Sequence, residues 1–252
     1  MSDALIAAFV AGITSLTVTF GKILWDGRQQ KHERQLAARE KLDRFREPLL
    51  SAADDLGSRI NNIRHDHFLL YLEVPERKQT ALLGTLFRFA QFFGWTEILY
   101  GAGGALRFER DESTKAVADA LRDVGRTLAV DRLDRTDPMD FTTTKLMIWR
   151  EEQRAIGELI RVDGDPTGCQ SFDSFASQYD QRFSTWFGTF AAQLADATTP
   201  QSDRLAKLQR LLADLIRVLD VDRLLVRFDE GGILTHPRWA RLEMLRATDT
   251  AG

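Results

Sequence analysis

Residues 81–100 read ALLGTLFRFAQFFGWTEILY and form a very apolar internal stretch of the 252-residue chain. The stretch is long enough for an α-helix to cross a hydrocarbon core of about 30 Å, so a membrane span has to be considered. Arg88 and Glu97 lie inside it, and a central arginine makes membrane insertion unfavourable by a few kcal/mol. We therefore expect a helix of a water-soluble domain. The density of aromatic side chains predicts that this helix is the central element of the core.

Apolar residues at three- and four-residue steps predict further helices on both sides of this stretch. We expect these helices over residues 49–72, 111–130, 141–162, 172–194 and 200–219. Glycine- and proline-rich breaks separate them, and no alternating β-strand pattern is sustained. Pro48 is expected to mark a kink or the first turn of a new helix, because a proline inside a helix costs about 3 kcal/mol. The sequence therefore predicts an all-α fold, a bundle of roughly six or seven helices.

The N-terminal segment 4–21, ALIAAFVAGITSLTVTFG, contains no charged residue and is followed directly by a charged region. Its length suits a transmembrane helix. A cleaved signal peptide would begin with positive charge, whereas this chain begins Met-Ser-Asp, and a buried core helix would be more amphipathic. We therefore expect a single transmembrane anchor within residues 1–25. The residues expected at the membrane interface are Lys22, Trp25, Arg28 and Lys31.

Positive charge is distributed unequally around the predicted anchor. No lysine or arginine precedes it, whereas eight lie between residues 22 and 46. The positive-inside rule then places the N-terminus outside and the C-terminal domain in the cytoplasm. The expected organisation is an anchor (1–25), a charged juxtamembrane helix (26–47), a helical bundle domain (48–230) and an irregular C-terminal tail (231–252).

Small side chains form a stripe on the predicted anchor. At steps of four residues, or directly beside that row, lie Ala7, Ala11, Ser15, Thr19, Ala8 and Gly12. Such a stripe lets two helices approach closely, and hydroxyl groups can bond across the contact. We expect self-association or pairing with another membrane protein. Two alternatives stay open: small residues are common in membrane spans, and the hydroxyl groups could line a pore if several copies assemble.

The composition excludes some classes of function. Hydrophobic residues make up 44% and charged residues 28% of the chain, which is ordinary for a globular protein. The net charge of −3 lacks the basic excess of a general nucleic-acid binder, so we expect no nucleic acid as partner. The single cysteine, Cys169, rules out an internal disulfide framework and a cysteine-rich zinc site.

Two short motifs resemble ligand sites only loosely. His65-Asp-His67 falls inside a predicted helix, where residues two apart point to different faces, so a polar helix edge is a better interpretation than a metal site. The glycine-rich segment 100–105, YGAGGA, has neither the dinucleotide-binding spacing nor the Lys-Ser/Thr of a P-loop. We interpret it as the end of a helix. No cofactor is expected.

Three further features could carry chemistry. Cys169 would need a base, and His236 is the one histidine in the C-terminal half, so we interpret Cys169 as a bystander. Glu151, Arg154 and Glu158 share one helix face and predict a solvated or inter-helix ion-pair face. The aromatic series of residues 172–190 predicts core packing, although part of it could form a protein interface.

These observations predict a membrane protein that binds other molecules. Its expected partners are the lipid bilayer and either a protein partner or further copies of the chain. We expect a protein-interaction or scaffold module, and no enzyme, because no catalytic motif is present. The alternatives are a membrane-active, pore-forming effector and an enzyme with an unrecognised helical active site.

Overall fold

The computed structural model describes residues 42–101, 112–133, 145–196 and 198–220, together with the single positions 29, 33 and 40. The chain divides into two compact units, residues 1–41 and 42–252. Nearly all of the described residues belong to the second unit. The predicted anchor with its small-residue stripe, its interface residues (Lys22, Trp25, Arg28 and Lys31) and the tail 231–252 lie outside the described residues. None of the described helices combines the length and apolarity that a membrane crossing requires.

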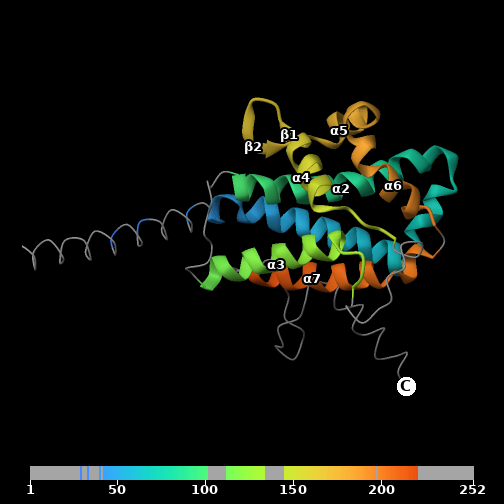
Figure 1. The fold of residues 1–252 in the computed structure, drawn as a ribbon. Coiled ribbons are helices and arrows are strands. Elements are labelled where there is room, and N and C mark those ends of the chain that lie inside the picture. Colours follow the sequence, from blue (N-terminus) through green and yellow to red (C-terminus); the bar gives the residue numbers. More distant parts are fainter. Residues whose placement is uncertain are drawn as a thin grey trace, which may run out of the picture. The chain divides into compact units, whose positions relative to one another are not determined.

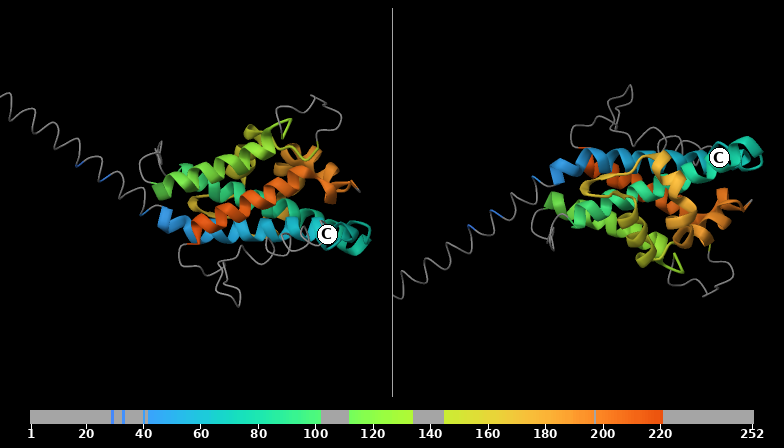
Figure 2. Two further views of the ribbon diagram at one scale, coloured as in Figure 1. Left: turned by 90° about the horizontal axis from the view of Figure 1, so that it is seen from below. Right: turned by 90° about the horizontal axis from the view of Figure 1, so that it is seen from above.

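The second unit is mostly helical, as predicted. A helix over residues 42–65 is followed by η1 (Phe68–Leu72), α2 (Pro75–Gly101), α3 (Glu112–Ala129), α4 (Arg150–Leu159), β1 (Arg161–Val162), β2 (Asp165–Cys169), α5 (Phe172–Gln178), the π-helix η3 (Tyr179–Phe183), α6 (Ser184–Leu194), η4 (Thr199–Gln201) and α7 (Asp203–Leu219). The long helices run alongside one another, with α3 against α7 (Figures 1 and 2). The shorter elements α4, α5 and α6 pack mainly on the α2 side of this group.

Helix α2 is a central element of the core, as its aromatic content predicts. Phe89 is fully buried, and its ring meets that of Phe190 on α6 edge-on at a centroid distance of 4.9 Å. The helix begins at Pro75, whose fixed φ suits a first helical turn, and ends at Gly101. Arg88, the charged residue that disfavours a membrane span, forms an ion pair with Asp55 of the helix over residues 42–65, at 2.9 Å.

The helix over residues 42–65 differs from the sequence prediction at two boundaries. It runs unbroken across Pro48, so this proline does not begin a new helix. Leu42, Phe45 and Leu49 are all buried, and their packing compensates for the hydrogen bond that proline lacks. The helix also ends at residue 65, before the expected 72, because His67 adopts a left-handed conformation with φ of 55°.

The expected helix 141–162 is much shorter in the structure. Helix α4 begins only at Arg150, where the backbone N–H of Trp149 donates to Glu152 Oε2 at 2.6 Å. It is followed by the antiparallel hairpin β1–β2, which sequence patterning missed. Gly164 supplies the positive φ of 81° that this tight turn requires. The predicted break at 163–168 is therefore a hairpin turn and part of a strand.

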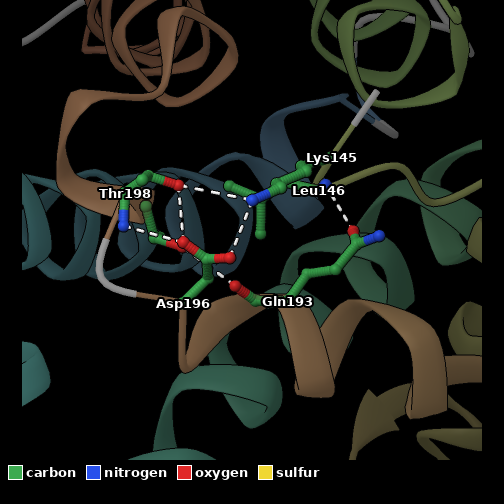
Figure 3. A network of polar contacts seen from close by, with 6 residues as sticks. Lys145, Leu146, Gln193, Asp196 and Thr198 are labelled. Atoms are coloured by element: carbon green, nitrogen blue, oxygen red, sulfur yellow. Dashed lines mark hydrogen bonds and ion pairs between the residues drawn. The ribbon is translucent and has the colours of Figure 1, made fainter. Parts of the chain in front are cut away.

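A polar network fixes the non-helical segment that leads into α4 (Figure 3). Lys145 Nζ donates to Asp196 Oδ2 at 2.7 Å, and Leu146 N donates to Gln193 Oε1 at 2.6 Å. Hydrogen bonds from Lys145, and then from Thr198, hold the pKa of the Asp196 carboxyl well below its usual range. Leu146 is buried with a φ of 59°, a conformation that the bond to Gln193 helps to hold. The network thereby sets where α4 begins.

The predicted helix 172–194 forms with one irregularity. It consists of α5, the five-residue π-helix η3 and α6. Phe175, Phe183, Phe187 and Phe190 are buried, whereas Phe172 and Trp186 are partly exposed. The aromatic series is therefore mainly core, which was the simpler of the two interpretations.

Candidate anion-binding site

A concave pocket of about 370 Å³ lies where α2, α3 and α4 meet. Three of its lining side chains are arginines and one is a carboxylate; the full lining is Phe93, Thr96, Glu97, Tyr100, Arg122, Arg150, Gln153 and Arg154. We call it the arginine pocket. Its volume is in the range of small-molecule sites, roughly 300–1,000 Å³.

Helical spacing explains why these side chains share one pocket. Phe93, Glu97 and Tyr100 follow one another at four- and three-residue steps on α2, and Arg150 and Arg154 stand four apart on α4. Residues three or four apart lie on the same helix face. Arg122 reaches the pocket from α3.

Arg150 is held in place by the backbone of α3. Its Nη2 donates to the carbonyl oxygen of Arg122 at 2.9 Å. Gly125 makes room for the guanidinium, because a Cβ at this position would overlap Arg150 Nη1. The buried Gln153 completes the contact by donating to the carbonyl oxygens of Gly125 at 2.9 Å and Ile148 at 2.7 Å. The first turn of α4 is thus fixed against α3.

Helices α2 and α4 approach closely beneath the pocket. A Cβ at Gly157 would lie 2.7 Å from Glu97 Cγ and 2.8 Å from the carbonyl oxygen of Phe93. At the other end of this contact, a Cβ at Gly94 would overlap Ile160 Cγ2, which follows the last turn of α4, and would lie 2.7 Å from Cys169 Sγ of β2. The two glycines therefore permit a helix crossing that larger side chains would separate, and the stem of Glu97 rests on the backbone of α4.

The pocket perturbs two ionisable groups. Burial raises the pKa of Glu97, and Glu158 acts in the same direction, while Arg154, Arg161 and Arg150 oppose the shift. Burial also raises the pKa of Tyr100, against the influence of Arg122 and Arg150. Desolvation therefore outweighs the attraction of the arginines at both positions.

The arginines are only partly neutralised by their neighbours. Arg122 forms an ion pair with Asp119, one turn before it on α3, at 2.6 Å. Arg154 is exposed, and among the described residues neither it nor Glu97 makes an ion pair or a side-chain hydrogen bond. The ion-pair face predicted for residues 151–158 is therefore solvated, and Arg154 is available to a ligand.

A second concavity, of about 530 Å³, has a smaller net positive charge. Its cations, Arg126, Arg132 and Lys207, stand beside the carboxylates of Asp123 and Asp131. Two carboxylates stand against three cations there, which leaves a net charge of +1, whereas one carboxylate stands against three arginines in the arginine pocket. The arginine pocket is therefore the better candidate for binding an anion.

The other sequence candidates do not enter the arginine pocket. His65 and His67 lie at the end of the 42–65 helix instead of inside a helix, and no group of three or more metal-ligating side chains is found among the described residues. Of the segment 100–105, only Tyr100 and Gly101 are described, and α2 ends there, as expected. His236 lies outside the described residues.

Cys169 is expected to react slowly with thiol reagents. It lies at the end of β2 against Gly94, and burial raises the pKa of its thiol from 9.0 to about 12. The nucleophile is the thiolate, so three pKa units reduce the reactive fraction at neutral pH roughly a thousandfold. Labelling with a thiol reagent at pH 7.5 should be much slower for the folded chain than in urea. Equal rates in the two conditions would contradict the buried position.

Sequence reasoning placed Arg154 in an ion-pair face and did not identify it, Arg122, Arg150 or Tyr100 as a ligand-binding residue. One signal was present, because Arg150 and Arg154 stand four apart on a short helix, and like charges at this spacing repel each other. The convergence of α3 on this face depends on the tertiary fold and had no signal in the sequence.

No family model, curated protein or solved structure matched the chain in comparisons with known proteins.

Proposed function

We propose that the chain is a single-pass membrane protein whose helical domain is a binding module on the cytoplasmic side. The uncharged segment 4–21 and the eight cations between residues 22 and 46 support the anchor and its orientation. The small-residue stripe supports self-association within the membrane.

The observation that carries the binding role is the surface around the arginine pocket. Trp149, immediately before Arg150, is 60% exposed, and Tyr100 in the pocket wall is 36% exposed. Tryptophan, tyrosine and arginine are the residue types that dominate binding energy at protein interfaces. Tyr100 and three arginines line the pocket, and Trp149 adjoins Arg150 in the chain, which favours this face as the one that receives a partner.

The chemistry of the pocket favours binding over catalysis. Guanidinium groups keep their charge at neutral pH, and they donate hydrogen bonds without exchanging protons. An enzyme would have to use Glu97 or Tyr100 of the lining as its acid or base. The raised pKa of Glu97 follows from its burial against α4 and needs no catalytic role.

Membrane fractionation tests the anchor. The full-length chain should remain in the membrane pellet after carbonate extraction, whereas a deletion of residues 1–25 should be soluble with an unchanged helical circular dichroism spectrum. The deletion removes the span and leaves the unit that begins at Leu42 intact. Full-length protein that is soluble without detergent would refute the anchor.

Crosslinking in the same membranes tests self-association. Gly12→Leu and Ala11→Leu place bulk in the stripe and should reduce crosslinked multimers, whereas Ile13→Phe on the other face of the predicted span should not. Equal crosslinking in all three variants would refute the stripe as the contact. Ion leakage from liposomes carrying the full-length chain would favour the pore-forming alternative.

A further inference from the structure

We propose that the arginine pocket binds a phosphate monoester group. This inference deepens the proposed function, on which it rests, because it names the ligand chemistry of the same face. The phosphate could be carried by a small solute or by a lipid headgroup, and both present the same dianionic oxyanion.

The charge of the pocket matches a dianion. Its lining contains three guanidinium groups and the carboxylate of Glu97, which leave a net charge of +2. Asp119 reduces the effect of Arg122 from outside the lining. A phosphate monoester carries a charge of about −1.5 to −2 at pH 7, whereas a carboxylate carries one. The balance therefore favours phosphate over a single carboxylate.

The geometry of the arginines also suits a phosphate. The planar guanidinium presents paired N–H groups that match two phosphate oxygens. Arg150 is already oriented by its bond from Nη2 to the carbonyl oxygen of Arg122, so little side-chain entropy is lost when a ligand binds. Arg154, which is exposed and lies one turn further along the same face of α4, can add its guanidinium to the same ligand.

The remaining walls suit the rest of a small phosphorylated molecule. Phe93 lines the pocket and is almost completely buried, and Tyr100 stands further along α2 on the same helix face. An apolar or aromatic group attached to the phosphate would contact these two rings. The volume of about 370 Å³ leaves room for such a group beside the phosphate.

The binding experiment uses the full-length chain in phosphatidylcholine nanodiscs. Calorimetric titration with inorganic phosphate, and separately with a nucleoside monophosphate, should give saturable binding that weakens as salt rises. A repeat in nanodiscs that contain phosphatidic acid distinguishes the two sources. If the headgroup fills the pocket, the affinity for the soluble phosphate falls in these discs; if the natural ligand is a solute, that affinity is unchanged.

Three variants assign the binding to the pocket. Arg154→Gln should weaken binding about tenfold, which corresponds to the loss of one charge-assisted hydrogen bond. Lys115→Gln removes the same charge from an exposed position on α3 outside the pocket and should change the affinity less than about twofold. Glu97→Gln removes the competing carboxylate and should strengthen binding, a gain that damage to the fold would not produce.

Two outcomes would overturn the proposal. The first is the absence of saturable binding of either phosphate probe to the wild-type chain. The second is an equal loss of affinity in Arg154→Gln and Lys115→Gln, which would indicate non-specific attraction. Neither outcome affects the anchor or the crosslinking, so a failure of this inference is distinguishable from a failure of the proposed function.

Discussion

Gly157→Ala is expected to lower the free energy of unfolding by about 1–3 kcal/mol, although alanine is the better helix former. The new methyl group would stand 2.8 Å from the carbonyl oxygen of Phe93 and 2.7 Å from Glu97 Cγ. The first of these atoms belongs to the backbone of α2 and cannot rotate away. Helices α2 and α4 would have to separate, and the pocket above them would widen. Thermal unfolding followed by circular dichroism measures the loss.

Gly84→Ala is the matched control, because it makes the same substitution in a helix without the contact. No atom lies within 4 Å of a Cβ at Gly84, which is also an interior position of α2. Here the helix propensity of alanine acts alone and should stabilise the fold by roughly 0.5–1 kcal/mol. For a domain of this size, 1 kcal/mol shifts Tm by about 2–4 °C. Stabilisation by both substitutions would show that the close crossing of α2 and α4 is wrong.

Local periodicity was sufficient to predict the long helices of the second unit. The expected helix 111–130 corresponds to α3, and 200–219 overlaps η4 and contains α7. In α7 the buried residues Leu205, Leu208 and Leu212 recur at helical spacing, so the sequence pattern predicts the buried face of this helix, which packs on α3. Helices of this kind can be predicted because the same apolar contact recurs at every turn.

The region around α4 could not be predicted in this way, because distant residues decide it. The segment before α4 is held by Asp196 and Gln193, which lie about fifty positions later in the chain. Its apolar spacing resembles a helix, but these bonds keep residues 145–149 out of a helix. The hairpin that follows has strands too short to show an alternating pattern. Tertiary contacts thus override local preference here.

The arginine pocket depends both on local helical spacing and on tertiary contacts. The spacing of Arg150 and Arg154 on one face is local and was visible in the sequence. Arg122 joins them only because Gly125 lets the first turn of α4 approach α3 closely. The sequence does not show why a glycine stands at position 125 of a helix, whereas the structure shows that it makes room for the guanidinium of Arg150. The ligand chemistry of the pocket therefore had to be inferred from the fold.

Arg204→Met is expected to have the largest effect on stability, about 2–5 kcal/mol. Arg204 is 5% exposed on α7. Its Nε donates to the carbonyl oxygen of Lys145 at 3.0 Å, and its Nη1 makes a short hydrogen bond to the carbonyl oxygen of Thr127. Thr127 is in the last turn of α3, where carbonyl groups lack partners within the helix. One side chain therefore joins α7, the end of α3 and the segment that leads into α4.

Methionine keeps much of the apolar stem of Arg204 but removes the donors, so two carbonyl groups lose their partner at about 1–3 kcal/mol each. Burial lowers the pKa of Arg204 to about 10, against the influence of Asp131, so the side chain remains a charged donor at neutral pH. Arg210→Met, at an exposed position of the same helix, should change stability by no more than about 0.5 kcal/mol. Urea unfolding of both variants measures the difference. Similar values for the two would mean that Arg204 does not join these elements, and the placement of α4, and with it the arginine pocket, would then need another explanation.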